Sequence, residues 1–196
     1  IYPDFAAVSR AFRLLASLVH PDGLLCAWGG DTRVTDVLDA CNARVLRYGL
    51  SDDKGELDAI ATLDTLGPDG AHFDLHVHGE HIGRFHSPMS GMHNLRNATA
   101  ALLTVLDLGV SVEDAAAALK SFKGIKKRQE VRGVVGGITV LDDYAHHPTA
   151  VELTIAGIRA AYPGQKLWAL FEAESNTSRR KVFEQRYPPA FAEADE

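Results

Sequence analysis

The chain of 196 residues has few cysteines, no excess of positive charge and no long apolar run. Its two cysteines, Cys26 and Cys41, lack the spacing of a zinc site, which favours a reducing, cytosolic setting. A formal net charge of −6 argues against non-specific nucleic-acid binding, which needs a basic face. No apolar run is long enough to cross a bilayer, and no charged-then-apolar leader is evident. We therefore expect an ordinary soluble globular protein with neither nucleic acid nor membrane as a partner.

Length and termini bear on domain number. A chain of 196 residues holds one large domain or two small ones, and either buries a real core. It begins at Ile1 rather than Met and stops at Glu196, inside a predicted helix-to-strand passage. We expect it to be a fragment of a longer protein.

The first fifty residues alternate between helix and strand patterns. The spacing of apolar residues predicts a helix from Phe5 to about Val19. A buried strand is predicted at 24–28, a second helix capped by Asp31, and a second strand near 44–48. This strand–helix–strand order indicates the edge of a parallel sheet.

The pattern then changes to a period of two. Phe73 and Leu75 alternate with polar residues and a turn follows at Gly79 and Glu80, which is typical of a hairpin with one solvent-exposed face. Three histidines on that face could in principle bind zinc: His72, His76 and His78. An exposed polar face explains them equally well, because no cysteine or supporting partner is evident, and we predict no metal site.

The clearest helix pattern opens at Ser90 and runs through the Ala- and Leu-rich residues 98–108 to Gly109. Its first turn carries three side chains that can meet a ligand: His93, Asn94 and Asn97. Helix capping by one asparagine explains one of them but not all three. A second helix is predicted from Ser111 to about Phe122.

The stretch 137–148 is the one around which the chain is organised. Residues 138–141 form a short, largely β-branched run that predicts a buried strand, and Pro148 opens a helix through about Tyr162. Four ionisable side chains lie between them: Asp142, Asp143, His146 and His147. Open α/β sheets bind ligands at the carboxyl ends of their strands, so this cluster favours a site. The alternative is a capped turn in which the aspartates only satisfy loop amides.

A basic cluster at 126–128 precedes a predicted strand pair at 130–135 and 138–141. A run of charged side chains in solvent would explain this cluster as well. We place a domain boundary just before it, after residue 122. Farther on, 166–171 predicts another buried strand, followed by polar residues and by a helix through Phe183 that Thr177 or Ser178 would cap. Two strands that each end in a polar cluster predict a doubly wound second domain.

Three motifs resemble those of the Mur ligases of peptidoglycan synthesis: Gly-Met-His-Asn-Leu-Arg-Asn at 91–97, Phe-Lys-Gly-Ile-Lys-Lys-Arg-Gln-Glu at 122–130, and Asp-Asp-Tyr-Ala-His-His-Pro at 142–148. The similarity covers nearly the whole chain, and Phe-Glu-x-x-Ser-Asn-Thr-Ser-Arg-Arg at 171–180 is similar to the murein peptide ligase branch. The resemblance implies an α/β fold. Residues 1–122 would be the later part of a central, ATP-binding α/β domain, and residues 123–196 the first part of a Rossmann-like C-terminal domain.

The resemblance also implies residue roles. The nucleotide would be bound by His93, Asn94, Asn97, Arg128 and Asp143, catalysis would involve His146 and His147, and the substrate would meet Glu174, Ser175, Asn176 and Arg179. Asn94 would read the adenine, because a side-chain amide offers the paired donor and acceptor that its edge needs. Arg128 and Asp143 would meet the ribose. The two histidines would lie near the phosphates or an acyl-phosphate.

The implied activity is ATP- and Mg²⁺-dependent joining of L-alanyl-γ-D-glutamyl-meso-diaminopimelate to UDP-N-acetylmuramate, in cell-wall recycling. The alternatives are UDP-N-acetylmuramate–L-alanine ligase, which shares the motif at 142–148, and a non-catalytic module that binds nucleotide or precursor. No Gly-x-x-x-x-Gly-Lys-Ser/Thr loop occurs, so phosphate and Mg²⁺ ligands are expected upstream and the isolated chain is expected to be inactive. Ala173 and Glu174 replace the usual Pro-Arg of the branch, and Lys127 replaces the first arginine of a usual pair.

Overall fold

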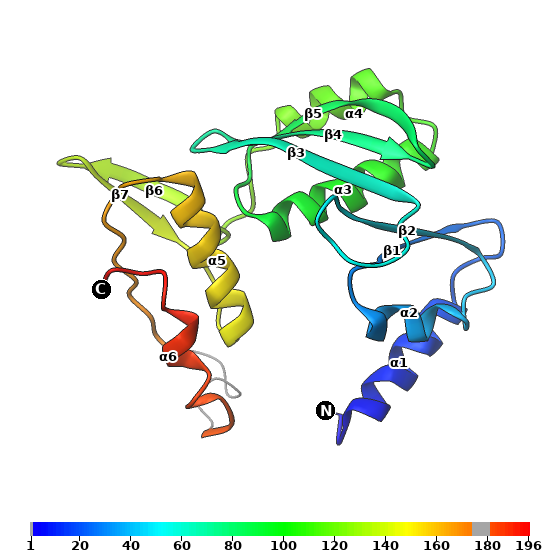
Figure 1. The fold of residues 1–196 in the computed structure, drawn as a ribbon, viewed down its shortest axis with the longest axis horizontal. Helices are drawn as coiled ribbons and strands as arrows, with labels where there is room; N and C mark the ends of the chain where they lie inside the picture. Colours follow the sequence, from blue (N-terminus) through cyan, green and yellow to red (C-terminus); the bar gives the residue numbers. More distant parts are fainter. Residues whose placement is uncertain (1, 174–180) are drawn as a thin grey trace. The chain divides into compact units, whose positions relative to one another are not determined.

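The computed structural model describes residues 2–173 and 181–196, with the side chain of Val182 left out. The chain divides into two compact units, and its elements are labelled in Figure 1. Unit 1 comprises Ile1–Asp64, His72–Phe85 and Arg96–Leu119, and unit 2 comprises Thr65–Ala71, His86–Leu95 and Lys120–Glu196. Helices and strands are mixed, so the predicted α/β class is confirmed. Within the described part, no helix is both long and apolar enough to span a membrane.

The N-terminal elements agree with the sequence pattern: α1 (Phe5–Ser17), β1 (Leu24–Trp28), α2 (Thr32–Leu38) and β2 (Arg44–Leu50). The first helix is capped by Asp4, whose carboxylate accepts a 2.7 Å hydrogen bond from the Ala7 N–H. The second is capped by Asp31, as predicted. β1 and β2 pair in parallel, which confirms the predicted parallel edge.

The sheet continues beyond these elements in the order β1-β2-β3-β4-β5, with β3 (Ala59–Gly67), β4 (Gly70–Val77) and β5 (Glu80–Ser87). β3 pairs in parallel with β2 and was missed in the sequence, because alanine, threonine and aspartate give only a weak strand pattern. The β4–β5 turn is centred on His78 and Gly79, with φ of 50° and 84°, one residue earlier than predicted. Two successive positive φ angles suit a tight hairpin.

The core of unit 1 follows the predicted period of two. Phe73 and Leu75 are fully buried, and Phe85 is 2% exposed. The Phe73 and Phe85 rings stack with their centroids 5.8 Å apart. The intervening Asp74 and His76 are only partly buried, so the hairpin has the expected wet face.

A partly buried ion pair adds a polar element to unit 1. Arg96 donates to both carboxylate oxygens of Asp53, at 2.5 and 3.1 Å, and Asp53 also accepts from the Trp28 indole N–H at 2.8 Å. The Asp53 side chain is only 8% exposed. Arg96 also lies over the Trp28 ring, 4.9 Å from its centroid. Arg96 lies on α3 (Met92–Asp107), so these contacts link the part of α3 that belongs to unit 1 to Trp28 and Asp53.

The predicted helical pair is confirmed. α3 ends before Gly109, whose φ of 86° suits a glycine helix end. α4 (Val112–Lys120) begins after Ser111, whose hydroxyl accepts a hydrogen bond from the Asp114 N–H.

Unit 2 contains the antiparallel hairpin of β6 (Glu130–Val135) and β7 (Ile138–Asp142), as predicted. Its turn is Gly136-Gly137, where both φ angles are positive. The expectation that residues 138–141 form a buried strand is wrong, since Ile138 is 68% exposed and Val140 49%. The reason is that, among the described residues, β6 and β7 pair with each other alone, as a two-stranded sheet.

The helix after the hairpin is confirmed as α5 (Pro148–Ala161), with proline in its first turn. Its Val151 and Ile155 form a small core with Ala190 of α6 (Tyr187–Ala190). α6 was not predicted, because two prolines in four residues argue against a helix except at its start.

The predicted strand at 166–171 is wrong. This segment has no regular secondary structure, and Trp168 and Leu170 are 64% and 97% exposed. Its backbone bonds instead to the last residues, with Ala169 N–H donating to Glu196 O at 2.8 Å and Asp195 N–H to Leu167 O at 2.9 Å. The described part of unit 2 therefore contains the antiparallel β6–β7 pair but no parallel strand pair, contrary to the doubly wound expectation.

Of the predicted helix through Phe183, the described residues form the 3₁₀ turn η1 (Lys181–Phe183). Its expected caps, Thr177 and Ser178, lie outside the described residues.

Candidate functional site

The structure brings most of the predicted nucleotide and catalytic residues into unit 2: His93, Asn94, Arg128, Asp143, His146 and His147. Asn97 lies one turn further along α3 and is counted with unit 1. The predicted substrate residues Glu174, Ser175, Asn176 and Arg179 lie outside the described residues.

The start of α3 depends on a glycine. Gly91 has a φ of 95°, and a side chain there would come within 2.9 Å of the His93 ring. Its Cα also lies 3.1 Å from where a Cβ on Gly157 would stand, so two glycines let α5 approach this turn closely. Asn94 is half-buried and donates one amide hydrogen to Ser90 O at 2.8 Å. In the part of the chain that the structure describes, no donor bonds to its carboxamide oxygen, which can therefore act as an acceptor.

The basic cluster forms a tight turn rather than an open charge run. Its Arg128 N–H donates to Ile125 O at 3.0 Å. Lys127 and Gln129, on either side of Arg128, have φ angles of 59° and 48°, which residues other than glycine rarely adopt. The Arg128 side chain is exposed and, among the described residues, pairs with no carboxylate. A fixed turn therefore presents a guanidinium that has no carboxylate partner within residues 2–173 and 181–196.

Sequence reasoning missed Gln129. Its Nε2 atom is buried and, within the described residues, makes no hydrogen bond. It lies 3.1 Å from a Cβ placed on Gly157. Its position directly after Arg128 in the 122–130 motif was the only available signal.

Asp143 satisfies loop amides, as the alternative interpretation of its motif expected. One oxygen accepts the Gln129 N–H at 2.9 Å and the other accepts the Ala145 N–H at 2.7 Å. The Thr154 hydroxyl adds a longer contact at 3.5 Å. The carboxylate thus links the basic turn, the end of the hairpin and α5.

The two histidines have different environments. His147 caps α5, with Nδ1 accepting the Thr149 N–H at 3.3 Å, and its ring packs edge-on to Phe183 at 4.8 Å. Burial, and then the positive charges of Arg186 and His146, lower the pKa of His147 below its ordinary value. His146 donates from Nδ1 to Tyr144 O at 3.0 Å, which leaves Nε2 as the acceptor. The lowered pKa favours the neutral form of His147.

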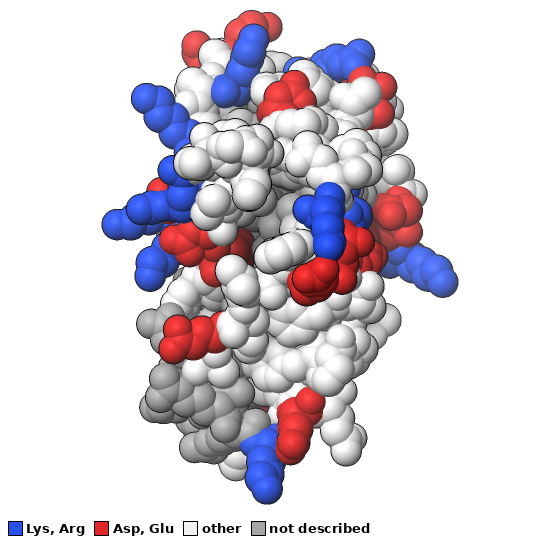
Figure 2. Space-filling view, turned by 90° about the vertical axis from the view of Figure 1, so that its left-hand side faces the viewer, with Lys and Arg blue, Asp and Glu red and all other residues white. Residues whose placement is uncertain are grey.

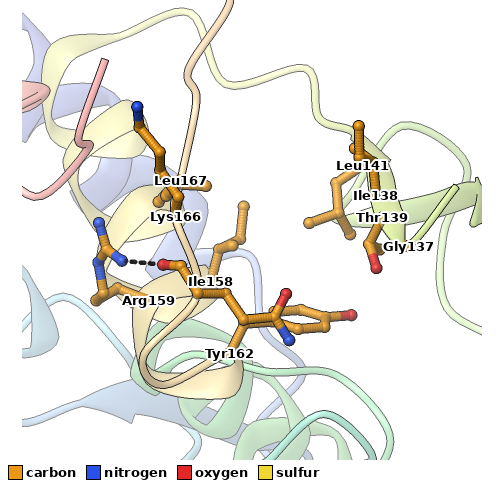
Figure 3. A pocket seen from close by; sticks show the side chains of 10 residues that line it. Gly137, Ile138, Thr139, Leu141, Ile158, Arg159, Tyr162, Lys166 and Leu167 are labelled. Carbon is orange, nitrogen blue, oxygen red and sulfur yellow. Dashed lines mark hydrogen bonds between the residues drawn. The ribbon is translucent and has the colours of Figure 1, made fainter.

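A cavity of about 340 Å³ lies elsewhere in unit 2 (Figure 3). It is lined by Gly137, Ile138, Thr139, Leu141, Ile158, Arg159, Tyr162, Gln165, Lys166 and Leu167. Its two cations are already paired, because Arg159 binds Asp195 at 2.7 Å and Lys166 binds Glu196 at 2.6 Å. None of the predicted nucleotide or catalytic residues lines it.

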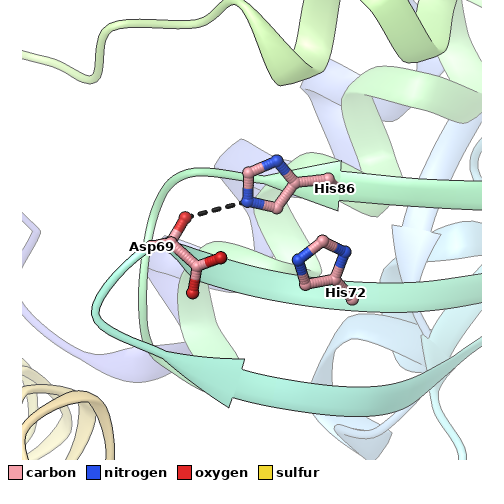
Figure 4. A group of neighbouring side chains, drawn as sticks. All are labelled: Asp69, His72 and His86. Carbon is pink, nitrogen blue, oxygen red and sulfur yellow. Dashed lines mark hydrogen bonds between the residues drawn. The ribbon is translucent and has the colours of Figure 1, made fainter.

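The zinc alternative is not supported as stated. The one group among the described residues with metal-like spacing is Asp69, His72 and His86, rather than His72 with His76 and His78. Figure 4 shows these side chains, and His86 Nε2 bonds to the Asp69 backbone oxygen at 2.8 Å. Asp69 is exposed to solvent.

On the face drawn in Figure 2, the coloured side chains of both signs are interspersed rather than gathered into a basic patch.

Comparison with known proteins decides the family. The family model of the Mur ligase middle domain matches residues 1–105, and that of the Mur ligase glutamate ligase domain matches residues 127–195. The chain belongs to the Mur ligase family.

Individual Mur ligases resemble the chain along almost its whole length. The UDP-N-acetylmuramate–L-alanine ligase of Caldanaerobacter subterraneus subsp. tengcongensis is 35% identical over 188 residues, which are 96% of this chain and 40% of that protein. The same enzyme of Salinibacter ruber is 34% identical over 198 residues, covering 100% of the chain and 40% of that protein. The chain thus spans about two fifths of the length of these curated relatives.

Two solved Mur ligase structures cover nearly all of the chain. A murein peptide ligase from Psychrobacter arcticus 273-4 superposes with a TM-score of 0.66 at 29% identity, covering 100% of this chain and 41% of that one. A UDP-N-acetylmuramate–alanine ligase from Thermotoga maritima superposes with a TM-score of 0.76 at 19% identity, covering 99% of this chain and 40% of that one. At this identity the likeness supports the fold alone. The resemblance found in the sequence is confirmed at the level of the family.

Proposed function

We propose that this chain forms part of an ATP-dependent ligase that joins a peptide amine to the carboxyl group of UDP-N-acetylmuramate in cell-wall recycling. The observation that carries the proposal is the placement in unit 2 of the α3 start, the Arg128 turn and the two histidines. These are the parts to which the Mur motifs assign nucleotide and catalytic roles. The order of the two matched domain families along the chain supports the same view.

In this proposal the residues named by the motifs bind and orient the nucleotide. Asn94 reads the adenine edge through its carboxamide, with His93 and Asn97 shaping the pocket. Arg128, backed by Asp143, meets the ribose end. His146, whose Nδ1 bonds to Tyr144 O, takes a proton at Nε2 from the incoming amine as the amine attacks the acyl-phosphate and phosphate leaves. His147 holds the start of α5 in place.

Mg²⁺ would accompany the nucleotide and neutralise phosphate charge in such a ligase. The residues of this site do not fit a Mg²⁺ site. Both oxygens of Asp143 already accept backbone N–H bonds, one of them from Gln129, the residue that follows the cationic Arg128. The metal ligands of the complete protein are therefore expected outside these residues.

The identity of the incoming amine has two candidates. The Ser-Asn-Thr-Ser-Arg-Arg stretch at 175–180 favours the tripeptide L-alanyl-γ-D-glutamyl-meso-diaminopimelate. The curated relatives at 34 and 35% identity are L-alanine ligases, which favours L-alanine. We propose the tripeptide, with Glu174, Ser175, Asn176 and Arg179 on the substrate side.

Phosphate release by the complete protein tests this proposal. With ATP, Mg²⁺ and UDP-N-acetylmuramate present, release should depend on the tripeptide and not on L-alanine. Release that depends on L-alanine alone would establish the second candidate. No release with either amine would leave only a nucleotide- or precursor-binding module. The isolated 196-residue chain should release none, because it lacks a phosphate-cradling loop.

A further inference from the structure

Three side chains meet beside the turn between β3 and β4: Asp69 in the turn, His72 on β4 and His86 on β5 (Figure 4). One nitrogen or oxygen atom of each lies within 4.8 Å of the corresponding atoms of the other two. Within residues 2–173 and 181–196, this is the one group of histidine, cysteine and acidic side chains gathered so closely. None of the three belongs to the proposed nucleotide, catalytic or substrate residues.

The backbone of the turn is fixed against the end of β5. Gly70, which follows Asp69, has a φ of 111°, and a side chain there would overlap the backbone oxygen of Ser87. Only glycine therefore lets the turn and the end of β5 approach so closely. His86 Nε2 also donates a hydrogen bond to Asp69 O at 2.8 Å. These contacts place the Asp69 carboxylate and the His86 ring next to one another.

The two histidines share the solvent-exposed face of the hairpin. His72 and His86 are half-buried, whereas the adjacent Phe73 and Phe85 are buried in the core. Successive residues of a strand face opposite sides of a sheet, so this alternation turns both histidines to the wet face. Asp69 is exposed to solvent. Water and dissolved ions can therefore reach the group.

Two imidazoles and one carboxylate suit zinc and related divalent transition metals. Ligand atoms about 2.0–2.2 Å from a tetrahedral ion lie about 3.3–3.6 Å apart, so binding must draw the three side chains together. None of them is fully buried, which permits this rotation. Mg²⁺ fits the group poorly, because it prefers oxygen ligands and keeps several waters.

The His86 ring already shows how it would face an ion. In Figure 4 the nitrogen that bonds to Asp69 O is the one turned towards the other two side chains. A metal bound there requires the ring proton on Nδ1 and replaces the hydrogen bond to Asp69 O. The loss of this hydrogen bond opposes binding, so the affinity should be lower than that of a structural zinc site.

We propose that Asp69, His72 and His86 bind one divalent transition-metal ion of the zinc type, with water completing its coordination. The ion joins the β3–β4 turn to both strands of the hairpin. It therefore stabilises the folded chain, because a ligand that binds only the folded state shifts the equilibrium towards it. The proposal does not depend on the proposed ligase activity.

Calorimetric titration of the complete protein with Zn²⁺ tests the site, with excess Mg²⁺ present to occupy oxygen-rich sites and no nucleotide added. The wild type should bind one Zn²⁺ at this group, and His72→Ala and His86→Ala should each weaken that binding at least about tenfold. Asp69→Asn removes the charged ligand, keeps the backbone oxygen that His86 contacts, and should also weaken binding. Zn²⁺ binding that is the same in the wild type and all three variants would overturn the proposal.

His76 provides the matched control on the same face. It is half-buried like His72 and its ring lies 5.0 Å from that of His81, but it is outside the close group of three. His76→Ala should bind Zn²⁺ within about twofold of wild type. Binding that is lost in His76→Ala and kept in His72→Ala would assign the ion to the His76 and His81 pair and overturn the proposal.

Unfolding by denaturant separates loss of the ion from loss of the fold. With a chelator present, His72→Ala should unfold at nearly the same midpoint as the wild type, because its side chain is only half-buried. Zn²⁺ should then raise the midpoint of the wild type and of His76→Ala but not that of His72→Ala. An equal rise in all three proteins would place the ion elsewhere and contradict the proposal.

Discussion

The two hairpins of this molecule are stabilised in different ways. The β4–β5 hairpin contributes Phe73, Leu75 and Phe85, which are at most 2% exposed. The β6–β7 hairpin exposes 75% of Val135 and 68% of Ile138. The first is fixed by apolar burial, whereas the segments around the second are fixed by hydrogen bonds such as those of Asp143.

The difference matters for function. Burial is non-directional and tolerates small shifts, whereas a hydrogen-bonded carboxylate fixes particular peptide groups at particular places. The candidate nucleotide residues of unit 2 lie where hydrogen bonds dominate. We therefore expect core substitutions to act on stability and substitutions in the basic turn to act on binding.

The largest effect should come from the buried hairpin. Phe73→Ala removes a ring with no exposure that stacks on Phe85, and should destabilise the chain by about 3–5 kcal/mol. Val135→Ala, at a residue 75% exposed, is the control and should change stability by less than about 0.5 kcal/mol. Denaturant unfolding measures both. Similar losses would mean that the contrast between the hairpins is false.

The buried ion pair should rank next. Asp53→Asn leaves Arg96 without its anion and should cost about 3 kcal/mol, the lower end for a buried pair, since Arg96 keeps 22% exposure. Glu196→Gln, which breaks the exposed pair with Lys166, should be within error of wild type in the same unfolding assay. A small loss for Asp53→Asn would mean that water screens the pair.

The same ion pair predicts a pH dependence. Burial would raise the pKa of Asp53, but hydrogen bonds from Arg96, the Leu50 N–H and Trp28 outweigh it and lower the pKa. A lowered folded-state pKa gives stability that is present above the unfolded value, about 3.9, and is lost as pH falls through the folded value. The wild type should therefore lose more stability than Asp53→Asn between pH 5 and 2, measured by unfolding. Parallel curves for the two proteins would contradict the assignment.

Adenine recognition should show a smaller effect, confined to binding. In the complete protein, Asn94→Ala should weaken ATP binding by about 1–3 kcal/mol, because the adenine edge loses its partners. Asn42→Ala, at an exposed loop position of unit 1, is the matched control and should bind ATP as the wild type does. Calorimetric titration compares the two, and equal affinities would remove Asn94 from the pocket.

The smallest effect concerns the α5 cap. His147 accepts from Thr149 N–H only when neutral, and its pKa is lowered in the folded chain. Stability from this group is present above the unfolded pKa of about 6.5 and is lost as pH falls through the folded value. His147→Asn keeps a capping oxygen that does not titrate in this range. Between pH 7.5 and 5.5 the variant should therefore lose less stability than the wild type, and the two losses should differ by about 1 kcal/mol or less. Denaturant midpoints at both pH values check this, and an equal or larger loss in His147→Asn would exclude the cap.

The sequence predicted elements whose signals are local. Asp31 and Pro148 marked the starts of α2 and α5, and the alternation around Phe73 identified the wet-faced hairpin. The prediction of a strand at residues 166–171 failed. An apolar run indicates that a segment tends to be buried, but it does not indicate which strand would pair with it. The β-branched run at 138–141 failed for the same reason, since its burial depends on further layers.

The candidate site was predicted in its residue types but not in its contacts. The motifs drew attention to Asn94, Arg128 and Asp143 through a family resemblance. That Asp143 bonds to Gln129 fourteen residues earlier depends on the path of the chain, which no local pattern encodes. The left-handed backbone at Lys127 and Gln129 was equally unpredictable, because neither residue type favours it.

Hydrogen exchange of the complete protein with and without ATP tests the central claim most directly, that this chain supplies the nucleotide site. ATP should slow exchange at the backbone amides of residues 91–97 and 125–130, the α3 start and the basic turn. Exchange at the exposed hairpin tip, residues 134–138, should not change. Protection confined to the hairpin tip or to the cavity lined by Arg159 and Lys166, with none at the basic turn, would contradict the account.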